Sequence, residues 1–213
     1  IIKQAKKTNA KVVYVDNPNN PIGTILNEDE VKYLVKHISP DTMIILDEAY
    51  NEYLDKADRM DSVSLFKAKK NVVCLSTFSK IYGLAGLRVG YMIADKYVLE
   101  NTGKMRLPFN VNIIAQQAAI AALSDRQFVR KSMLHNKAER EYLQKGLRKL
   151  GIKQIESYTN FVTIDVKRDA APVFKALQKE GLIIRPLANY GLPTFLRIST
   201  GLRHQDSKLL KKL

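Results

Sequence analysis

Residues 76–91 read STFSKIYGLAGLRVGY, a stretch in which hydroxyl groups, one lysine, glycines and one arginine follow one another closely. It continues an apolar run at residues 71–76 that is typical of a strand buried on both faces. A lysine just after such a strand suits covalent amine chemistry, because a lysine amine changes its pKa readily when it is desolvated. The stretch therefore predicts a ligand site at the end of a strand, with Lys80 as the reactive amine.

A phosphate fits beside this lysine. The hydroxyls of Thr77 and Ser79 and the guanidinium of Arg88 are phosphate-binding groups, and glycines let a backbone come close to an anion. The phosphate-binding loop of a nucleotide enzyme is the alternative. However, the pattern G-x-x-x-x-G-K-[ST] of such loops is absent, and Lys80 precedes the glycines instead of following them.

The first half of the chain has the pattern of an α/β fold. Residues 12–16, 42–46 and 87–94 are further apolar runs with the character of buried strands. Asn27, with Glu30 three residues later, predicts the N-cap of a helix that runs to about residue 37. Helical patterns between the first strands predict a sheet that is at least partly parallel.

The second half predicts a smaller α+β domain. Helices are expected at residues 112–123, 126–150 and 171–180, and strands at residues 161–166, 182–185 and 195–199. The long helices make a natural hinge. We therefore predict that residues 1–109 are part of a large cofactor-binding domain, and that residues 110–213 hold interdomain helices and a small C-terminal domain.

Other polar side chains also follow the ends of expected strands. Asp47 and Tyr50, in the tetrad DEAY, could hold a protonated ring nitrogen and offer a hydroxyl, although DEAY alone could equally bind a metal or begin a helix. Residues 17–23, NPNNPIG, are by themselves only a turn. Arg185 and Arg197 end two late strands, and would form an anion clamp if those strands are adjacent.

The composition limits the classes of function. The chain has 46% hydrophobic residues, lacks the run of about 20 apolar residues that a membrane span needs, and has no secretory signal. Its one cysteine, Cys74, excludes an internal disulfide and fits a reducing cytoplasm. The net charge of +14 raises nucleic-acid binding as a hypothesis. Because the Lys and Arg residues are scattered, we expect neither a nucleic-acid nor a membrane partner, and a charge that attracts anionic substrates.

Three motifs together resemble fold-type-I aminotransferases. NPNNPIG, DEAY about two dozen residues later, and SKIYGLAGLRVGY have the order and spacing of that family, and the resemblance extends from about residue 12 to about residue 201. It implies pyridoxal 5'-phosphate as the cofactor and no metal. It also implies that Lys80 holds the cofactor as a Schiff base and moves the proton during transamination.

The resemblance assigns the remaining contacts to the cofactor. It implies that Asp47 pairs with the pyridinium nitrogen, that Tyr50 and Asn20 contact the phenolic oxygen of the ring, and that Thr77, Ser79 and Arg88 hold the phosphate.

Further motifs narrow the resemblance to histidinol-phosphate aminotransferases of histidine biosynthesis. They are PFNVN at residues 108–112, NFV at 160–162, IIRP at 183–186 and YGLP at 190–193 before FLRIS. This family interconverts histidinol phosphate and 2-oxoglutarate with imidazole-acetol phosphate and glutamate. It implies that Arg185 and Arg197 bind the phosphate of the first substrate and then the distal carboxylate of the second. Ile22 departs from the family's usual Thr and removes a hydroxyl.

Three alternatives remain: another aminotransferase for aromatic or other amino acids, a phosphothreonine-type decarboxylase, and a non-catalytic regulatory domain that keeps the cofactor as a ligand. The chain begins at Ile1, without Met, and soon enters a strand-like run. This predicts an N-terminally truncated chain, inactive alone because part of its site is missing. We expect the full-length protein to be a cytoplasmic homodimer.

Overall fold

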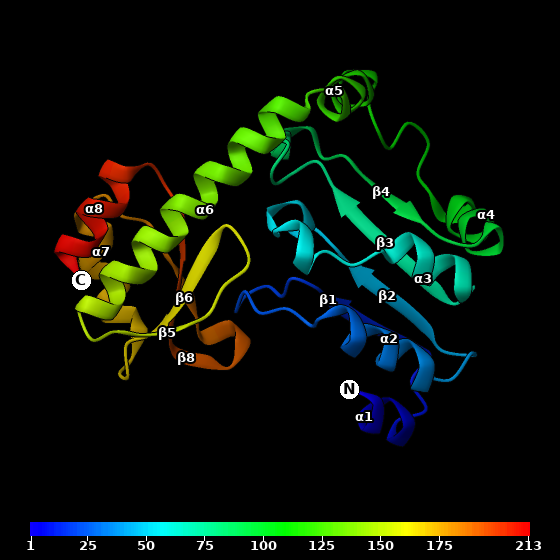
Figure 1. The fold of residues 1–213 in the computed structure, drawn as a ribbon, viewed down its shortest axis with the longest axis horizontal. Coiled ribbons are helices and arrows are strands. Elements are labelled where there is room, and N and C mark those ends of the chain that lie inside the picture. The colour runs from blue at the N-terminus through cyan, green and yellow to red at the C-terminus, as the bar shows by residue number, and fades with distance from the viewer. The chain divides into compact units, whose positions relative to one another are not determined.

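The computed structural model describes residues 1–213, which form two compact units. The first comprises Ile1–Pro18 and Leu26–Arg130, and the second comprises Asn19–Ile25 and Lys131–Leu213. Figure 1 labels the elements of both. The predicted domain boundary between residues 109 and 110 stays a prediction. No helix combines the length and the apolar character that crossing a bilayer would require.

The first unit contains a four-stranded sheet and five helices. Its elements are α1 (Ile2–Lys7), β1 (Val12–Asp16), α2 (Glu28–His37), β2 (Met43–Asp47), α3 (Ser62–Ala68), β3 (Val72–Thr77), β4 (Gly90–Ile93), α4 (Lys96–Met105) and α5 (Ile113–Ser124). Short 3-10 helices lie at Asn51–Tyr53, Lys56–Asp58 and Ala85–Leu87. The strand order is β1-β2-β3-β4. The first three strands are parallel, and β4 runs antiparallel to β3.

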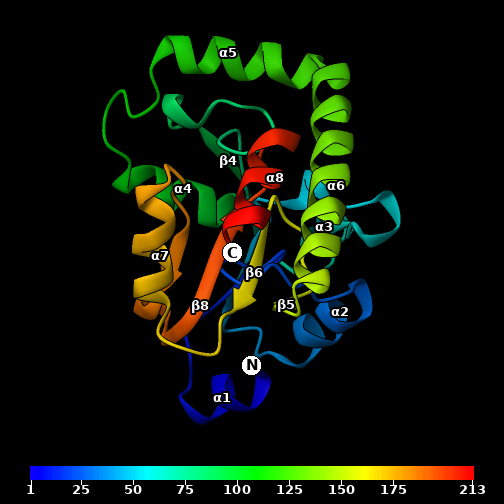
Figure 2. The ribbon, with the colours of Figure 1, turned by 90° about the vertical axis from the view of Figure 1, so that its left-hand side faces the viewer.

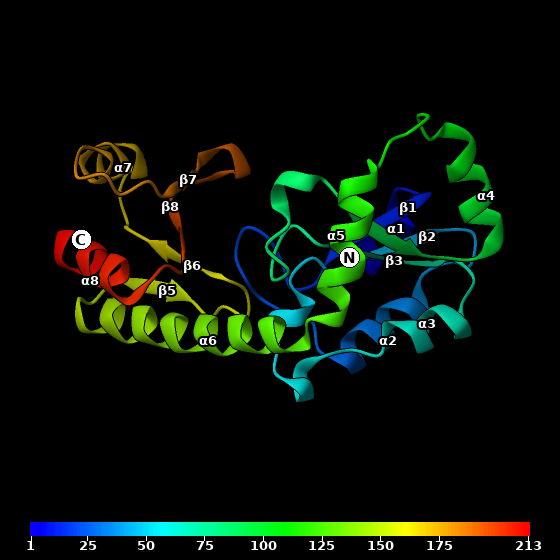
Figure 3. The same cartoon turned by 90° about the horizontal axis from the view of Figure 1, so that it is seen from above.

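Alternation along the strands separates the two faces of this sheet. Val13 and Val15 of β1, with Ile44 and Leu46 of β2, are buried in one cluster with apolar residues of α2 and α3. Figure 3 shows both helices on this same face. Because successive side chains point to opposite faces, Tyr14 and its neighbours on β2 lie on the other face. The packed face anchors the sheet, and the opposite face carries the strand-end polar groups.

The predicted helix cap is confirmed. The Glu30 N–H donates to Asn27 Oδ1 at 2.9 Å, and the Asn27 N–H donates to Glu30 Oε2 at 2.8 Å. These two bonds satisfy backbone donors that the first turn of a helix leaves free. They fix the start of α2, which buries Val31, Leu34 and Val35 against the sheet.

The second unit contains a four-stranded antiparallel sheet with three helices on one face. Its elements are α6 (Arg126–Lys149), β5 (Lys153–Ile155), β6 (Phe161–Asp165), α7 (Ala170–Lys179), β7 (Arg185–Leu187), a 3-10 helix at Ala188–Tyr190, β8 (Leu192–Ser199) and α8 (Arg203–Lys212). The strand order is β5-β6-β8-β7. Figure 2 shows α6, α7 and α8 beside β6 and β8. Val162 and Ile164 of β6, with Leu196 and Ile198 of β8, are buried in one cluster with apolar residues of these helices.

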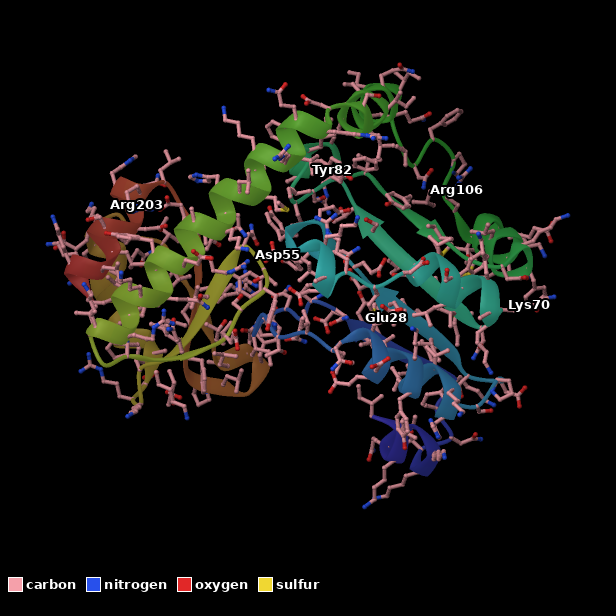
Figure 4. All side chains as sticks on the ribbon, viewed as in Figure 1. Glu28, Asp55, Lys70, Tyr82, Arg106 and Arg203 are labelled. Atoms are coloured by element: carbon pink, nitrogen blue, oxygen red, sulfur yellow. The ribbon has the colours of Figure 1, made fainter.

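An ion pair joins α8 to α6. Arg203, labelled in Figure 4, donates to the buried carboxylate of Glu139 from Nε at 2.9 Å and from Nη2 at 3.0 Å. A fork of two parallel N–H bonds fixes direction as well as distance. The pair therefore holds α8 in one orientation on α6.

The fold class predicted from the sequence is confirmed: a mostly parallel α/β sheet and a separate α+β part. Three strand predictions are displaced. β8 begins at Leu192, three residues before the predicted start at residue 195. β7 begins at Arg185 and not at residue 182, because Leu182 closes the end of α7 by donating to the Leu177 carbonyl at 2.9 Å. β4 is shorter than residues 87–94, because Arg88 has a left-handed backbone, with φ of 52°.

Candidate active site

Lys80 lies in the loop that follows β3. Buried Phe78 anchors this loop, since its N–H donates to the Val89 carbonyl at 3.1 Å and its carbonyl accepts from the Leu84 N–H at 3.0 Å. The Lys80 Nζ lies 5.1 Å from the centre of the Tyr50 ring, a distance at which a cation and an aromatic ring attract each other. The loop therefore presents the amine beside a buried ring.

Asp47, the last residue of β2, has a partner on each carboxylate oxygen. Its Oδ1 accepts from the Ala49 N–H at 3.1 Å, and its Oδ2 accepts from the Tyr14 hydroxyl. Partial burial, the bond to Asp47 and the charges of Asp47 and Asp16 raise the pKa of the Tyr14 hydroxyl. Tyr14 therefore keeps its proton and acts as a donor.

The three predicted phosphate ligands are connected to one another. The Ser79 N–H donates to Thr77 Oγ1 at 3.0 Å. Arg88 Nη1 donates to Ser79 Oγ at 3.3 Å and to the Ala85 carbonyl at 2.8 Å. The left-handed backbone of Arg88 turns its side chain back onto this loop. Two hydroxyls and a guanidinium thus converge, as a phosphate site requires.

One pocket of about 540 Å³ joins these groups. It is lined by Asp47, Ala49, Leu75, Ser76, Thr77, Ser79, Lys80, Arg88, Gly90, Tyr91 and Met92. Its volume is in the range of small-molecule sites. A Cβ at Gly90 would come within 2.6 Å of the Ser76 carbonyl oxygen, so only glycine lets β4 approach β3 at this wall. The amine, the carboxylate and the phosphate ligands therefore face one cavity.

Glu48 is a titratable group that the sequence did not single out. It is 8% exposed and accepts a hydrogen bond from Ser62 Oγ. Burial, reinforced by the charges of Glu52 and Asp47, raises the pKa of Glu48 to about 7, although the bond from Ser62 opposes the rise. A proton acceptor that titrates near neutral pH thus directly follows Asp47 in the chain.

Arg185 and Arg197 meet in the second unit. They are register partners on the antiparallel strands β7 and β8. Both line a pocket of about 460 Å³, together with Phe174, Ile183, Ile184, Pro186, Asn189 and Ser199. The two strands are adjacent, which is the condition for an anion clamp. The two guanidinium groups face one cavity, which suits an anion.

Arg197 retains an unused donor. Its Nη1 donates to Asn20 Oδ1, and its Cζ lies 4.9 Å from the centre of the Phe161 ring. Its Nε is buried and has no hydrogen-bond partner. Because buried polar groups are nearly always paired, this Nε is a donor that the structure leaves unsatisfied.

Asn20 reaches Arg197 because residues 19–25 fold onto the second sheet. The Thr163 hydroxyl of β6 donates to the Pro21 carbonyl at 2.6 Å, and the Tyr158 N–H donates to the Gly23 carbonyl at 2.8 Å. Gly23 has φ of +88°, a conformation that favours glycine. The segment read from the sequence as a turn is therefore one wall of the second unit.

The predicted residues fall into two groups. Asp47, Thr77, Ser79, Lys80 and Arg88 line one pocket in the first unit, and Tyr50 contacts Lys80 without lining that pocket. Asn20, Arg185 and Arg197 belong to the second unit. Sequence reasoning missed Tyr14 and Glu48. The alternation of β1 predicts that Tyr14 and Asp16 share a face, but the register that pairs Asp16 with Asp47 is not visible in the sequence.

The family is defined by comparison with known proteins. The model of aminotransferase class I and II matches residues 1–213. This chain belongs to the class I and II aminotransferase family, which confirms the resemblance seen in its motifs.

Within the family, this chain is similar to histidinol-phosphate aminotransferases. The histidinol-phosphate aminotransferase of Caldicellulosiruptor saccharolyticus is 41% identical over 203 residues, which are 95% of this chain and 57% of that protein. The chain therefore spans little more than half the length of this curated relative.

Solved structures of similar proteins have the same fold as this chain. A histidinol-phosphate aminotransferase from Sinorhizobium meliloti, in complex with pyridoxal-5'-phosphate, superposes with a TM-score of 0.90 at 31% identity, over 99% of this chain and 58% of that one. An L-threonine-O-3-phosphate decarboxylase from Porphyromonas gingivalis gives 0.86 at 28% identity, over 99% and 66%.

Proposed function

We propose that this chain is part of a pyridoxal-phosphate-dependent aminotransferase of histidine biosynthesis. The enzyme would interconvert histidinol phosphate and 2-oxoglutarate with imidazole-acetol phosphate and glutamate. The observation that carries the proposal is the pocket that Lys80 and Asp47 share with Thr77, Ser79 and Arg88. The similarity to histidinol-phosphate aminotransferases along 95% of the chain supports the choice of substrate.

The donor set of the first pocket fits the cofactor. Thr77, Ser79 and Arg88 offer hydroxyl and guanidinium donors for its phosphate, and the Asp47 carboxylate is an acceptor for a protonated ring nitrogen. Tyr50, which lies beside Lys80, is our candidate for the phenolic oxygen of the ring, and for Asn20 this role rests on the motif resemblance alone. When bound, pyridoxal phosphate supplies an electron sink for a substrate Cα–H bond.

Lys80 has two tasks in this proposal. Its Nζ would hold the cofactor covalently, and the free Lys80 amine would accept and return the proton at the substrate Cα. Tyr50, whose buried ring lies 5.1 Å from Nζ, limits the positions that the amine can take. Asp47 would accept a hydrogen bond from the ring nitrogen.

Arg185 and Arg197 bind the anionic end of each substrate. A phosphate and a carboxylate must both be accepted, because the two half-reactions use different amino donors. Two guanidinium groups that line one pocket offer more donor directions than a single bidentate arginine. We further propose a homodimer for the whole protein, a cytoplasmic location, and neither nucleic-acid nor membrane partners.

The test is a transamination assay on the natural protein that carries residues 1–213, with histidinol phosphate and 2-oxoglutarate. Lys80→Ala should abolish both turnover and the absorbance of the lysine-bound cofactor, whereas Lys70→Ala, at an exposed site outside both pockets, should leave both unchanged. Turnover retained by Lys80→Ala would contradict the proposal.

The substrate is tested separately at the second pocket. Arg185→Ala should lower kcat/KM for histidinol phosphate by about 10- to 100-fold, the value of one or two charge-assisted hydrogen bonds. Equal kcat/KM in both proteins would reject histidinol phosphate as the substrate. Phenylalanine used as well as histidinol phosphate would favour an aromatic aminotransferase instead.

A decarboxylase is the second candidate, because the phosphothreonine decarboxylase from Porphyromonas gingivalis has the same fold at 28% identity. Release of carbon dioxide from threonine phosphate, without formation of glutamate from 2-oxoglutarate, would favour it.

A further inference from the structure

Tyr14 occupies a position that the proposed chemistry does not yet use. It lies at the centre of β1, where its neighbours Val13 and Val15 are buried against the helices on one face of the sheet. Its own side chain is therefore on the opposite face, and 55% of the residue is exposed. From there its hydroxyl donates to Oδ2 of Asp47, on the neighbouring strand.

The Asp47 carboxylate is held at two points. The Ala49 N–H fixes Oδ1 at 3.1 Å, and the Tyr14 hydroxyl fixes Oδ2. A carboxylate offers about four acceptor positions, so two bonds leave room for a ring N–H. Two fixed donors also stop rotation about the Cβ–Cγ bond, and a positioned carboxylate loses less entropy when it binds a cation.

Charged side chains lie near the contact between Tyr14 and Asp47. Asp16 is the register partner of Asp47, and its charge adds to that of Asp47 in disfavouring the phenolate of Tyr14. Lys80 lines the same pocket as Asp47. The Tyr14 hydroxyl holds Oδ2 with a neutral donor, so it adds no charge that would repel a cationic ring nitrogen.

We propose that Tyr14 is a positioning residue that holds the Asp47 carboxylate in the orientation needed to pair with the ring nitrogen of the cofactor. The inference rests on the proposed function. It extends that function because Tyr14 acts through Asp47 and lies outside the motifs that identify the family.

The first experiment needs no cofactor. With tyrosines labelled at ¹³Cζ, the signal that disappears in Tyr14→Phe identifies Tyr14. This signal should remain that of a neutral phenol to a higher pH than the ordinary titration of a tyrosine, and Asp47→Asn should shift its titration to lower pH. If Asp47→Asn leaves the titration of Tyr14 unchanged, the contact does not exist in solution, and the inference is overturned whatever the protein catalyses.

The second experiment uses the cofactor-loaded natural protein in a double-mutant cycle. Tyr14→Phe removes one oxygen atom and keeps the ring, so the packing of β1 is preserved. It should weaken the affinity for pyridoxal phosphate by about 10-fold. It should also move the pH at which the absorbance of the lysine-bound cofactor changes, in the direction set by Asp47→Asn. In the Asp47→Asn background, Tyr14→Phe should have almost no further effect. Tyr97→Phe, on α4, is the matched control and should change neither quantity.

The outcomes separate the two proposals. Uptake of pyridoxal phosphate at Lys80, read as a mass increase after borohydride reduction, supports the proposed function. If uptake occurs but Tyr14→Phe has the same effect with and without Asp47, the role of Tyr14 is refuted and the function stands. If the unmodified protein takes up no cofactor at Lys80, the function and this inference both fail.

Discussion

Glu48 should make the folded protein lose stability as the pH rises through neutrality. The residue is 8% exposed, and burial is the main reason that the pKa of Glu48 rises from 4.5 to about 7. In the folded state the carboxyl therefore keeps a proton that the unfolded chain has already lost. Stability from this group is complete below pH 4.5 and falls as the pH rises to about 7. The difference in pKa corresponds to about 3 kcal/mol.

Glu48→Gln provides the perturbation. The amide oxygen can still accept the bond from Ser62 Oγ, but the side chain cannot ionise. Relative to the difference between the two proteins at pH 4, the variant should gain about 1 kcal/mol of stability by pH 5 and about 3 kcal/mol by pH 8.

The assay is urea unfolding of both proteins at several pH values between 4 and 8. Subtracting one curve from the other removes the contribution of every other titrating group. Asp206→Asn is an independent comparison. Burial raises the pKa of Asp206 from 3.8 to about 6, so its effect on the free energy of unfolding should appear at lower pH than that of Glu48. A difference between the protein and Glu48→Gln that does not change with pH would refute the reasoning.

Three further predictions concern stability and reactivity. Asn136→Ala should lower the free energy of unfolding by about 2 kcal/mol, measured by urea unfolding, since buried Asn136 donates to the Thr159 carbonyl at 3.2 Å and accepts from Thr200 Oγ1 at 2.7 Å. Asn27→Ala should cost about 1 kcal/mol in the same measurement, because it removes the cap of α2, and a loss as large as that of Asn136→Ala would contradict this ranking. Cys74 should resist a thiol reagent until the protein unfolds, because it is 3% exposed and burial raises its pKa to about 12; rapid labelling of the folded protein would contradict this.

Local signals in the sequence were sufficient for much of the fold. The cap at Asn27 depends on residues three positions apart, and β2 depends on one apolar run that ends at Asp47. Lys80 and Arg88 are close in the chain, so their shared loop follows from the pattern of residues 76–91. Such features need no knowledge of the tertiary structure.

Other features depend on contacts between distant residues. Tyr14 and Asp47 are 33 positions apart, and their bond requires the register of β1 against β2, which no local pattern specifies. The burial of Glu48 results from α3 packing over the end of β2. The short β7 could be placed only after the end of α7 was known, because Leu182 belongs to the helix cap.

The bond from Thr163 to Pro21 has a consequence for biosynthesis. It joins positions 142 residues apart, and Asn20 depends on the same late strands for its contact with Arg197. Residues 19–25 emerge from the ribosome long before β6 and β8 have been synthesised. During translation this segment therefore cannot yet form its contacts with those strands. The second unit can be completed only when nearly all of the chain has been made, and residues 131–213 expressed alone would lack one wall. An expression strategy for this unit should therefore supply residues 19–25 as well.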